Sequence, residues 1–346
     1  MHVATVGLDL AKRVFQAHGA DAEGRAVLRR KLGRGEVLAF FAKLPPCLVG
    51  MEACGGAHHW AREIAALGHE VRLMPGAYVR PYVKRGKTDA GDAEAICEAV
   101  TRPGMRFVAV KSPDQQAALM LHRTRDLLVR QRTALVNALR GHMAEFGIVA
   151  PVGIARVGEL VTILLDEEAA AMPSLARRAL LALAAELETL GVRIDEAEAA
   201  ILAWHKGNEA SRRLAAVPGI GPITASAIVA TAGDASQFAS GRHFAAWLGL
   251  VPRQNSSGGK QRQGGTSKAG DGYLRRLLVL GATSLVRQAQ RRTKEPAFAW
   301  LRGLLERRPA RLASVGQANK TARLAWALRA RGEAYRRPAP AVAAAA

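Results

Sequence analysis

The chain has 346 residues, 49% of them hydrophobic, so it is long enough to form two or three domains with buried cores. Its formal net charge is +21, from 50 Lys and Arg against 29 Asp and Glu. An excess this large repels itself unless a polyanion neutralises it, which favours nucleic acid as the partner. A membrane surface is the rival partner, but no run approaches the roughly 20 apolar residues that a spanning helix needs.

The N-terminal residues, the cysteines and the aromatic content indicate where the protein acts and how it contacts nucleic acid. The sequence begins Met1-His2-Val3 without a basic n-region, so we expect no secretory signal. The three cysteines show no CxxC spacing, which indicates reduced thiols and a cytoplasmic protein. Aromatic residues make up only 5%, which disfavours a single-strand binder built on base stacking and favours contacts to phosphate and sugar.

The first 110 residues alternate between patterns typical of strands and of helices. We expect strands at Val3–Asp9, Val14–Gly19 and Ala26–Leu32, a helix at Glu36–Leu44, a strand at Cys47–Glu52, a helix at Ala57–Leu67, a strand at Glu70–Met74 and a helix at Asp89–Val100. This order implies an α/β fold with a mixed sheet flanked by helices. It is the order of ribonuclease-H-like folds.

From residue 111 onward the pattern is helical. Long helices are expected at Pro113–Gly147 and Ser174–Trp204, and together they would form an extended arm. At Leu214 the composition changes to shorter helices punctuated by Pro, Gly, Thr and Ser. We therefore expect a sheet domain at 1–110, a helical arm at 111–210, a mainly helical domain at 211–337 and a disordered tail at 338–346.

Two carboxylates stand at the ends of predicted strands. Asp9 ends the run Val-Ala-Thr-Val-Gly-Leu-Asp, and Glu52 ends the run Leu-Val-Gly-Met-Glu. A structural explanation exists for each, because a strand-end acid can face solvent or cap a turn. A functional explanation also exists, since a charge that directly follows apolar strand residues can point into a site.

Two further carboxylates, Asp89 and Asp92, lie three residues apart at the start of a predicted helix, which places them on one helical face. They suit the positive end of the helix dipole, and Thr88 or Asp89 can be the N-cap. Combined with the two strand-end acids, they supply the oxygen ligands with which two Mg²⁺ or Mn²⁺ ions cleave a phosphodiester. Three basic residues just upstream would draw a phosphate backbone toward them: Lys84, Arg85 and Lys87.

The segment Val217–Pro222 reads Val-Pro-Gly-Ile-Gly-Pro and separates two helical stretches. Such a hairpin exposes the backbone N–H groups of Gly219 and Gly221 at a helix N-terminus, where a DNA phosphate can bind. It resembles the helix-hairpin-helix DNA-binding motif. A plain turn between two helices is the alternative.

A basic, hydroxyl-rich loop follows at Gly249–Asp271 and leads into a helix. The candidates for phosphate contacts in and after this loop are Arg253, Lys260, Arg262, Lys268, Arg275 and Arg276. Ser256 and Ser257 are candidates for a nucleophile, although a serine needs a base or a metal to activate it. By themselves these residues favour phosphate contact over a nucleophile, and the absence of a Gly-x-Ser-x-Gly elbow argues against a hydrolase triad.

Taken in order, these pieces resemble the DEDD transposases of insertion-sequence family 110, subgroup 1111, which are bridge-RNA-guided serine recombinases. The resemblance covers nearly the whole chain and is carried by Gly-Leu-Asp9, Met-Glu52-Ala, Lys87-Thr-Asp89-Ala-Gly-Asp92-Ala, Pro218-Gly-Ile-Gly221-Pro, Gly249-Leu-Val-Pro252, Ser257-Gly258 and Ser267-Lys268. It implies a RuvC-like first domain whose metal ligands are the four acids. It also implies a C-terminal transposase domain with a catalytic serine, at Ser257 in preference to the adjacent Ser256.

The resemblance implies a mechanism and partners as well. Ser257 would attack a DNA phosphodiester with the help of divalent metal and form a phosphoserine linkage, so that strands are cut and rejoined without ATP. A structured noncoding RNA would pair with the donor and target DNA. Because two DNAs and several active sites must meet, we expect a dimer or tetramer, with subunits in contact through the arm at Pro113–Trp204.

Two other functions stay open on the sequence. A metal-dependent, structure-specific nuclease similar to Holliday-junction resolvases would use the acids and leave the serine loop to bind phosphate. A basic architectural or RNA-binding protein would use neither. A covalent protein–DNA species distinguishes a recombinase from the nuclease, and loss of activity in Asp89→Asn excludes the architectural protein.

Overall fold

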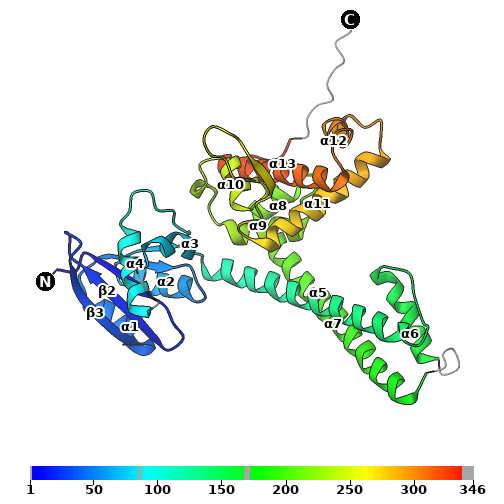
Figure 1. The fold of residues 1–346 in the computed structure, drawn as a ribbon, viewed down its shortest axis with the longest axis horizontal. Coiled ribbons are helices and arrows are strands. Elements are labelled where there is room, and N and C mark those ends of the chain that lie inside the picture. The colour runs from blue at the N-terminus through cyan, green and yellow to red at the C-terminus, as the bar shows by residue number, and fades with distance from the viewer. Residues whose placement is uncertain (1, 85, 87, 167–171, 337–346) are drawn as a thin grey trace, which may run out of the picture. The chain divides into compact units, whose positions relative to one another are not determined.

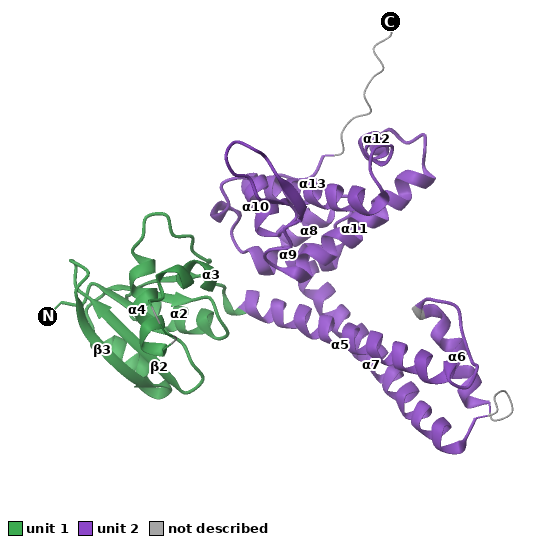
Figure 2. Cartoon of the chain, in the orientation of Figure 1, with its two compact units in different colours: residues 1–113 green, residues 114–346 purple. Residues whose placement is uncertain are grey.

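The computed structural model describes residues 2–84, 86, 88–166 and 172–336. The chain divides into two compact units, residues 1–113 and residues 114–346 (Figure 2). The tail expected at 338–346 lies outside the described residues.

The first unit is built on a five-stranded sheet with the order β3-β2-β1-β4-β5. The strands are β1 (Thr5–Asp9), β2 (Val14–Ala20), β3 (Ala26–Gly33), β4 (Leu48–Glu52) and β5 (Glu70–Met74). β1, β2 and β3 pair antiparallel, whereas β4 pairs parallel with both β1 and β5. The expected mixed α/β sheet is therefore confirmed, and its arrangement is consistent with a ribonuclease-H-like fold.

Helices cover both faces of this sheet because its strands carry apolar residues on both faces. Val6 and Leu8 of β1 and Met51 of β4 pack with α1 (Val37–Ala42) and α2 (Ala57–Ala66). The opposite face is covered by α4 (Asp89–Val100). The short connecting helices are η1 (Arg34–Glu36), α3 (Gly76–Val79) and η2 (Arg80–Tyr82).

Two glycines allow α4 to lie unusually close to the sheet. Gly7 of β1 and Gly50 of β4 are direct partners in the parallel ladder and face α4. A Cβ atom at Gly7 would collide with backbone atoms of Ala93 and Cys97, and one at Gly50 would lie 2.8 Å from Val100 Cβ. The residues two positions further along the same face are Asp9 and Glu52, so this close approach sets where α4 meets both acids.

The second unit begins with a helical arm. In Figure 1, α5 (Pro113–Ala144) and α7 (Ser174–Gly207) run side by side, and the short α6 (Val157–Leu165) lies near their far end. The turn helix η3 (Ile154–Arg156) precedes α6. Leu139, Met143, Leu160 and Leu180 are among the buried residues that hold these three helices together. Long helices were expected here, and α5 and α7 have 32 and 34 residues.

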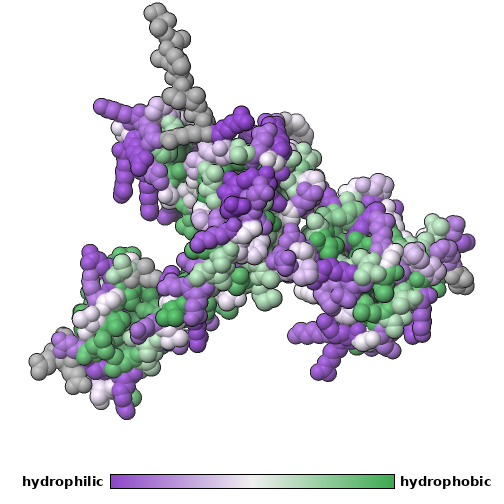
Figure 3. Space-filling view, turned by 180° about the vertical axis from the view of Figure 1, so that it is seen from behind, coloured by the Kyte–Doolittle hydropathy of each residue, from purple (hydrophilic) through white to green (hydrophobic). Residues whose placement is uncertain are grey.

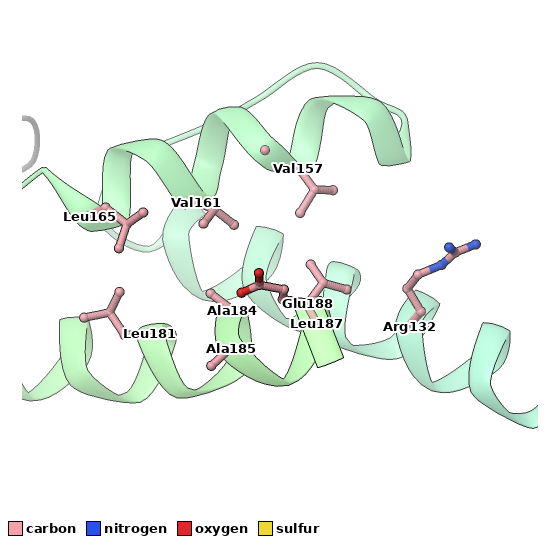
Figure 4. A pocket seen from close by; sticks show the side chains of 10 residues that line it. Arg132, Val157, Val161, Leu165, Leu181, Ala184, Ala185, Leu187 and Glu188 are labelled. Atoms are coloured by element: carbon pink, nitrogen blue, oxygen red, sulfur yellow. The ribbon is translucent and has the colours of Figure 1, made fainter. Parts of the chain in front are cut away.

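A groove of about 680 Å³ opens on the arm. Apolar side chains of α6 face those of α7 across it, with Glu188 between them and Arg132 of α5 to one side (Figure 4). Leu165, at the end of α6, is 69% exposed, and hydrophobic surface gathers at this part of the arm (lower left of Figure 3). The arm therefore presents apolar surface that its own helices do not bury.

The remaining helices of the second unit pack around one core, which includes Ile228, Phe244 and Leu278. They are α8 (Glu209–Ala215), α9 (Pro222–Ala232), η4 (Ala235–Gln237), α10 (Gly241–Trp247), α11 (Gly272–Arg291), η5 (Pro296–Phe298), α12 (Ala299–Leu305) and α13 (Ala310–Arg331). None of the described helices is long and apolar enough to cross a membrane.

A buried polar network joins the arm to this helical core. His122 of α5 is 1% exposed, and its two ring nitrogens lie 3.0 Å from Tyr273 Oη and 3.1 Å from Ser226 Oγ. Burial lowers the pKa of His122 to about 4, so the ring is neutral at pH 7. Because Ser226 belongs to α9 and Tyr273 to α11, one imidazole fixes three helices relative to one another.

The segment after α10 departs from expectation. We expected a loop from Gly249 to Asp271, but it contains a two-stranded antiparallel hairpin of β6 (Pro252–Gln254) and β7 (Gln263–Thr266). Ser257 and Lys260 form a further bridge near its tip. Both serine candidates therefore lie on a hairpin rather than on an irregular loop.

Candidate metal centre and serine hairpin

Three of the four predicted metal ligands converge in the first unit. One carboxylate oxygen each from Asp9, Asp89 and Asp92 lies within 4.8 Å of the other two. Asp9 comes from the end of β1, and the two others come from the first turn of α4. Thr88 is the N-cap, since its Oγ1 accepts a hydrogen bond from the Gly91 N–H at 3.1 Å. The carboxylate of Asp89 is therefore not used as the cap and is available to a cation.

The fourth acid, Glu52, lies beside this group without belonging to it. It ends β4, the strand next to β1, and its carboxylate packs against Gly76, where a Cβ atom would lie 3.1 Å from Oε2. Burial raises the pKa of Glu52, and the negative charge of Asp92 raises it further. The charge of Asp92 thus acts on Glu52, but the Glu52 carboxylate is not among the three that converge.

Burial and mutual repulsion both act on the acids of this cluster. Burial, and then the negative charges of Asp92 and Asp89, raise the pKa of Asp9 to about 6. Glu52 adds to this increase, whereas a hydrogen bond from the Leu10 backbone N–H opposes it. A divalent cation would offset the repulsion, and carboxylate oxygens are the ligands that Mg²⁺ and Mn²⁺ prefer.

The basic residues predicted beside this centre are only partly described. Lys84 forms an ion pair with Glu94 of α4, with 2.6 Å between Nζ and Oε1, and its side chain is 74% exposed. The Glu94 partner raises the pKa of Lys84. Arg85 and Lys87 lie outside the described residues.

The glycine hairpin lies between α8 and α9. Gly219 has φ +84°, and its carbonyl packs against Gly281 of α11, where no side chain would fit. Gly221 is the N-cap of α9 and is exposed. Neither glycine N–H donates a hydrogen bond to any residue that the structure describes. The geometry thus leaves both amides open at the helix start, where the sequence predicted a phosphate contact.

The two serines have different surroundings. Ser256 Oγ accepts hydrogen bonds from the Arg262 N–H at 3.1 Å and from Gln254 Nε2 at 3.4 Å. Ser257 Oγ is exposed and has no hydrogen-bond partner within the described part of the chain. Its backbone oxygen accepts from the Lys260 N–H at 3.0 Å and closes a two-residue turn.

The turn itself explains the glycines that follow Ser257. Gly258 and Gly259 have φ of +55° and +75°, as a type I′ hairpin turn requires. Ser257 and Lys260 are direct cross-strand partners, so their side chains leave the same face of the hairpin. The turn therefore places the side chains of Lys260 and Ser257 on one face of the hairpin.

The other basic candidates separate into two groups. Arg253, Lys260, Arg262 and Lys268 are exposed, and Lys268 has a left-handed backbone with φ 55°. Arg275 instead donates from Nη1 to the carbonyl oxygens of Leu248 and Ala269, at 3.0 and 2.9 Å. Arg276 is paired with Asp126. The guanidinium groups of Arg275 and Arg276 thus already have protein partners.

Comparisons with known proteins agree with these features. Residues 6–148 match the DEDD transposase family of IS110 type, and residues 211–297 match the transposase IS116/IS110/IS902 family. The chain is 53% identical to a probable family 20 transposase of Pseudomonas aeruginosa, over 97% of this chain and 99% of the relative. The chain belongs to the IS110/IS116 family of insertion-sequence transposases.

Further relatives carry insertion-element names. The transposase is 41% identical to the transposase for insertion sequence element IS1328 of Yersinia enterocolitica, over 96% of this chain and 99% of the relative. It is 40% identical to the transposase for IS1111A of Coxiella burnetii, over 96% of this chain and 92% of the relative. The protein is therefore an enzyme that acts on DNA, as the sequence predicted.

Sequence reasoning missed several residues that shape the transposase's site. Gly7 and Gly50 set the distance between the sheet and α4. Both glycines belong to the strand motifs that end in Asp9 and Glu52, but the motifs did not predict this role. Their signal was the two-residue spacing to Asp9 and to Glu52. Cys54 lies close enough to the acids that, after burial, the charges of Glu52 and Asp9 raise the pKa of its thiol.

Proposed function

We propose that this transposase cuts and rejoins DNA with a divalent-metal centre in its first unit and Ser257 as a separate nucleophile. The observation that carries the cutting step is the convergence of Asp9, Asp89 and Asp92 within 4.8 Å. The observation that favours Ser257 over Ser256 is that only the Ser257 hydroxyl is left without a partner by the described residues.

Asp9, Asp89 and Asp92, with Glu52 beside them, would hold Mg²⁺ or Mn²⁺. The bound metal would supply Lewis-acid stabilisation of charge on the phosphodiester oxygens. The protein's own part is to hold four carboxylates in place through the β1–α4 contact. Asp9, whose pKa is raised to about 6, would have to lose any proton before it binds metal.

In the covalent step, Ser257 Oγ attacks the phosphorus of a DNA phosphodiester. The P–Oγ bond forms, the bond from phosphorus to the 3′ oxygen breaks, and the serine proton ends on that 3′ oxygen. Rejoining is the reverse reaction with the 3′-hydroxyl of another strand, so one bond replaces another and no ATP is needed. Lys260, the cross-strand partner of Ser257, would contact the phosphate, and Arg253 and Arg262 would add positive charge.

Trapping of the covalent intermediate tests this mechanism. The substrate is a duplex that carries the joined ends of the element, incubated with the full chain and Mg²⁺ or Mn²⁺ and then denatured. We expect a protein–DNA adduct from wild type and from Ser256→Ala, and none from Ser257→Ala. An adduct that survives Ser257→Ala, or that disappears only in Ser256→Ala, would exclude this assignment.

A metal-dependent nuclease is the second candidate, because the three convergent acids need no serine to hydrolyse DNA. It predicts cut DNA without an adduct, full activity in Ser257→Ala and no activity in Asp89→Asn. If the protein only organises DNA or RNA, Asp89→Asn should leave every activity intact. The adduct assay, run on both variants, separates all three functions.

Two partners belong to the same proposal. A structured noncoding RNA would guide the choice of DNA, for which the support is the family resemblance and the net charge of +21. RNA that copurifies with the chain and maps beside its gene would support this partner. A second copy would pack against the arm groove, because Leu165 is exposed there and Arg132 Nε is buried without a hydrogen-bond partner among the described residues.

A further inference from the structure

A row of residues crosses three strands on the face of the sheet that α4 covers. Asp9 of β1 is the direct partner of Gln16 in β2, and Gln16 is the direct partner of Lys31 in β3. Directly opposed residues point to the same face of a sheet. Strands lie about 4.8 Å apart, so Lys31 begins about 10 Å from Asp9, along a line that leads out of the metal centre.

A second row runs parallel to the first. Gly7, His18 and Arg29 are opposed in the same way across β1, β2 and β3. Arg29 is exposed, and its charge contributes to lowering the pKa of Glu94, which is paired with Lys84. Positive charge on this side of the sheet therefore extends from Lys31 past Arg29 to Lys84.

The charge at Lys31 is available to a ligand. Lys31 is exposed and forms no ion pair or hydrogen bond with another described residue. Gln16, between Lys31 and Asp9, is half-buried and equally has no hydrogen-bond partner within that part of the chain. Along this row, the amide of Gln16 therefore comes next to Asp9, and the ammonium group of Lys31 comes after it.

The other face of β3 differs. Arg30, the residue between Arg29 and Lys31, lies over the Phe40 ring of α1, with 5.7 Å from Cζ to the centroid. Arg34, just after the strand, lies 5.1 Å from the centroid of Trp60. These cations cover apolar residues of the core, whereas those on the α4 face do not.

We propose that Lys31 and Arg29, with Gln16 between Lys31 and the metal centre, bind the phosphate backbone of the DNA strand that enters this centre. This inference rests on the proposed function, because it places the cut phosphate at Asp9. A DNA strand rises about 3.4 Å per nucleotide along the duplex axis, so Lys31 would contact a phosphate within about three nucleotides of the cut. DNA is the expected ligand because the row starts at the centre that would cut it.

The test compares Lys31→Gln with Arg30→Gln. The two substitutions remove the same charge from adjacent residues on opposite faces of one strand. DNA binding is measured by fluorescence anisotropy at several salt concentrations, with the full chain in an Asp89→Asn background that prevents cutting. For Lys31→Gln we expect the slope of log affinity against log salt to fall by about 0.7 on single-stranded DNA or about 0.9 on duplex. For Arg30→Gln we expect no change in slope.

A thermodynamic cycle locates the contact. Single phosphates of the DNA are replaced by neutral methylphosphonates, one position at a time around the cut. A methylphosphonate at the contacted position, within about three nucleotides of the cut, should weaken binding by the chain that retains Lys31, and should weaken binding by the Lys31→Gln chain no further. A full additional loss in Lys31→Gln at every position would overturn the inference.

The remaining outcomes are also decisive. Equal slopes for Lys31→Gln and Arg30→Gln would mean that only net charge matters, and would refute the contact. The same would follow if Lys31→Gln weakened binding of an RNA of the same sequence but not of the DNA. If wild type never cuts DNA, the proposed function fails, yet a slope change confined to Lys31→Gln would still establish the binding row.

Discussion

At Asp9, burial and the charges of the neighbouring acids both oppose ionisation. Its pKa is raised to about 6, so in the metal-free protein the folded chain keeps a proton that the unfolded chain loses near its ordinary value. Stability from this group is therefore complete at pH below about 4 and is lost as pH rises through about 6. A shift of this size corresponds to on the order of 3 kcal/mol.

A divalent cation should reverse that loss. We expect Mg²⁺ or Mn²⁺ to slow hydrogen exchange of β1 and α4 amides strongly near about pH 7.5 and weakly near about pH 5, because protons compete for Asp9 at the lower pH. Asp9→Asn should remove both the pH dependence and the response to metal. Glu23→Gln, which changes an exposed acid of the same unit, is the control. Equal protection by metal at both pH values would contradict a role for Asp9 as a ligand.

Single site residues were predictable where the neighbouring sequence marks them. Asp9 and Glu52 were visible because each follows an apolar strand, and Asp89 and Asp92 because three residues separate them at a helix start. The proximity of β1, β4 and α4 is a tertiary property that no local pattern records, so the convergence was expected from the combination of the four acids and from the family resemblance. The difference between Ser256 and Ser257 depends on a hydrogen bond to the Arg262 N–H, which no sequence pattern records.

At the scale of elements, the contact between β1 and α4 positions the acids. Gly7→Ala would place a methyl group against backbone atoms of Ala93 and Cys97, which cannot move aside as a flexible side chain can. We expect the first unit to lose roughly 1–3 kcal/mol of stability through overpacking. We also expect weaker metal binding, because α4 carries Asp89 and Asp92 away from Asp9.

The matched control for this change is Gly104→Ala. A Cβ atom there has no neighbour within 4 Å, and the residue belongs to the same unit. Denaturant unfolding and metal titration by calorimetry measure the two effects. If Gly7→Ala bound metal as tightly as Gly104→Ala, the glycine contact would not be what positions the acids.

Helices and strands were predictable from the sequence where apolar residues recur with a helical or strand period, and less so elsewhere. The strands of the first unit and the helices α5 and α7 follow such periods, and their expected positions agree with the structure within a few residues. The hairpin of β6 and β7 was expected as a loop, because every residue of β6 is exposed and no apolar alternation marks the strands. It is instead defined by the turn at Gly258 and Gly259, whose positive φ angles suit a hairpin.

At the scale of the whole molecule, the proposed strand exchange would bring together two DNAs, and we proposed that more than one copy of the chain does this. The arm offers a surface for this assembly. Its groove is lined mainly by apolar side chains of α6 and α7, and Leu165, which lines it, is 69% exposed. A second copy that covers this groove would remove Leu165 from water.

Leu165→Glu should therefore weaken self-association. Full burial of a leucine side chain contributes about 1.5–3 kcal/mol, so the dissociation constant should rise at least about tenfold, as measured by analytical ultracentrifugation. Val152→Glu is the matched control, because Val152 is 97% exposed on the same unit but does not line the groove. We expect Leu165→Glu to keep metal-dependent cutting, which needs one set of acids, and to lose rejoining, which needs two chains. A wild-type chain that rejoins DNA as a monomer, or equal dissociation of both variants, would show that the groove is not the subunit contact.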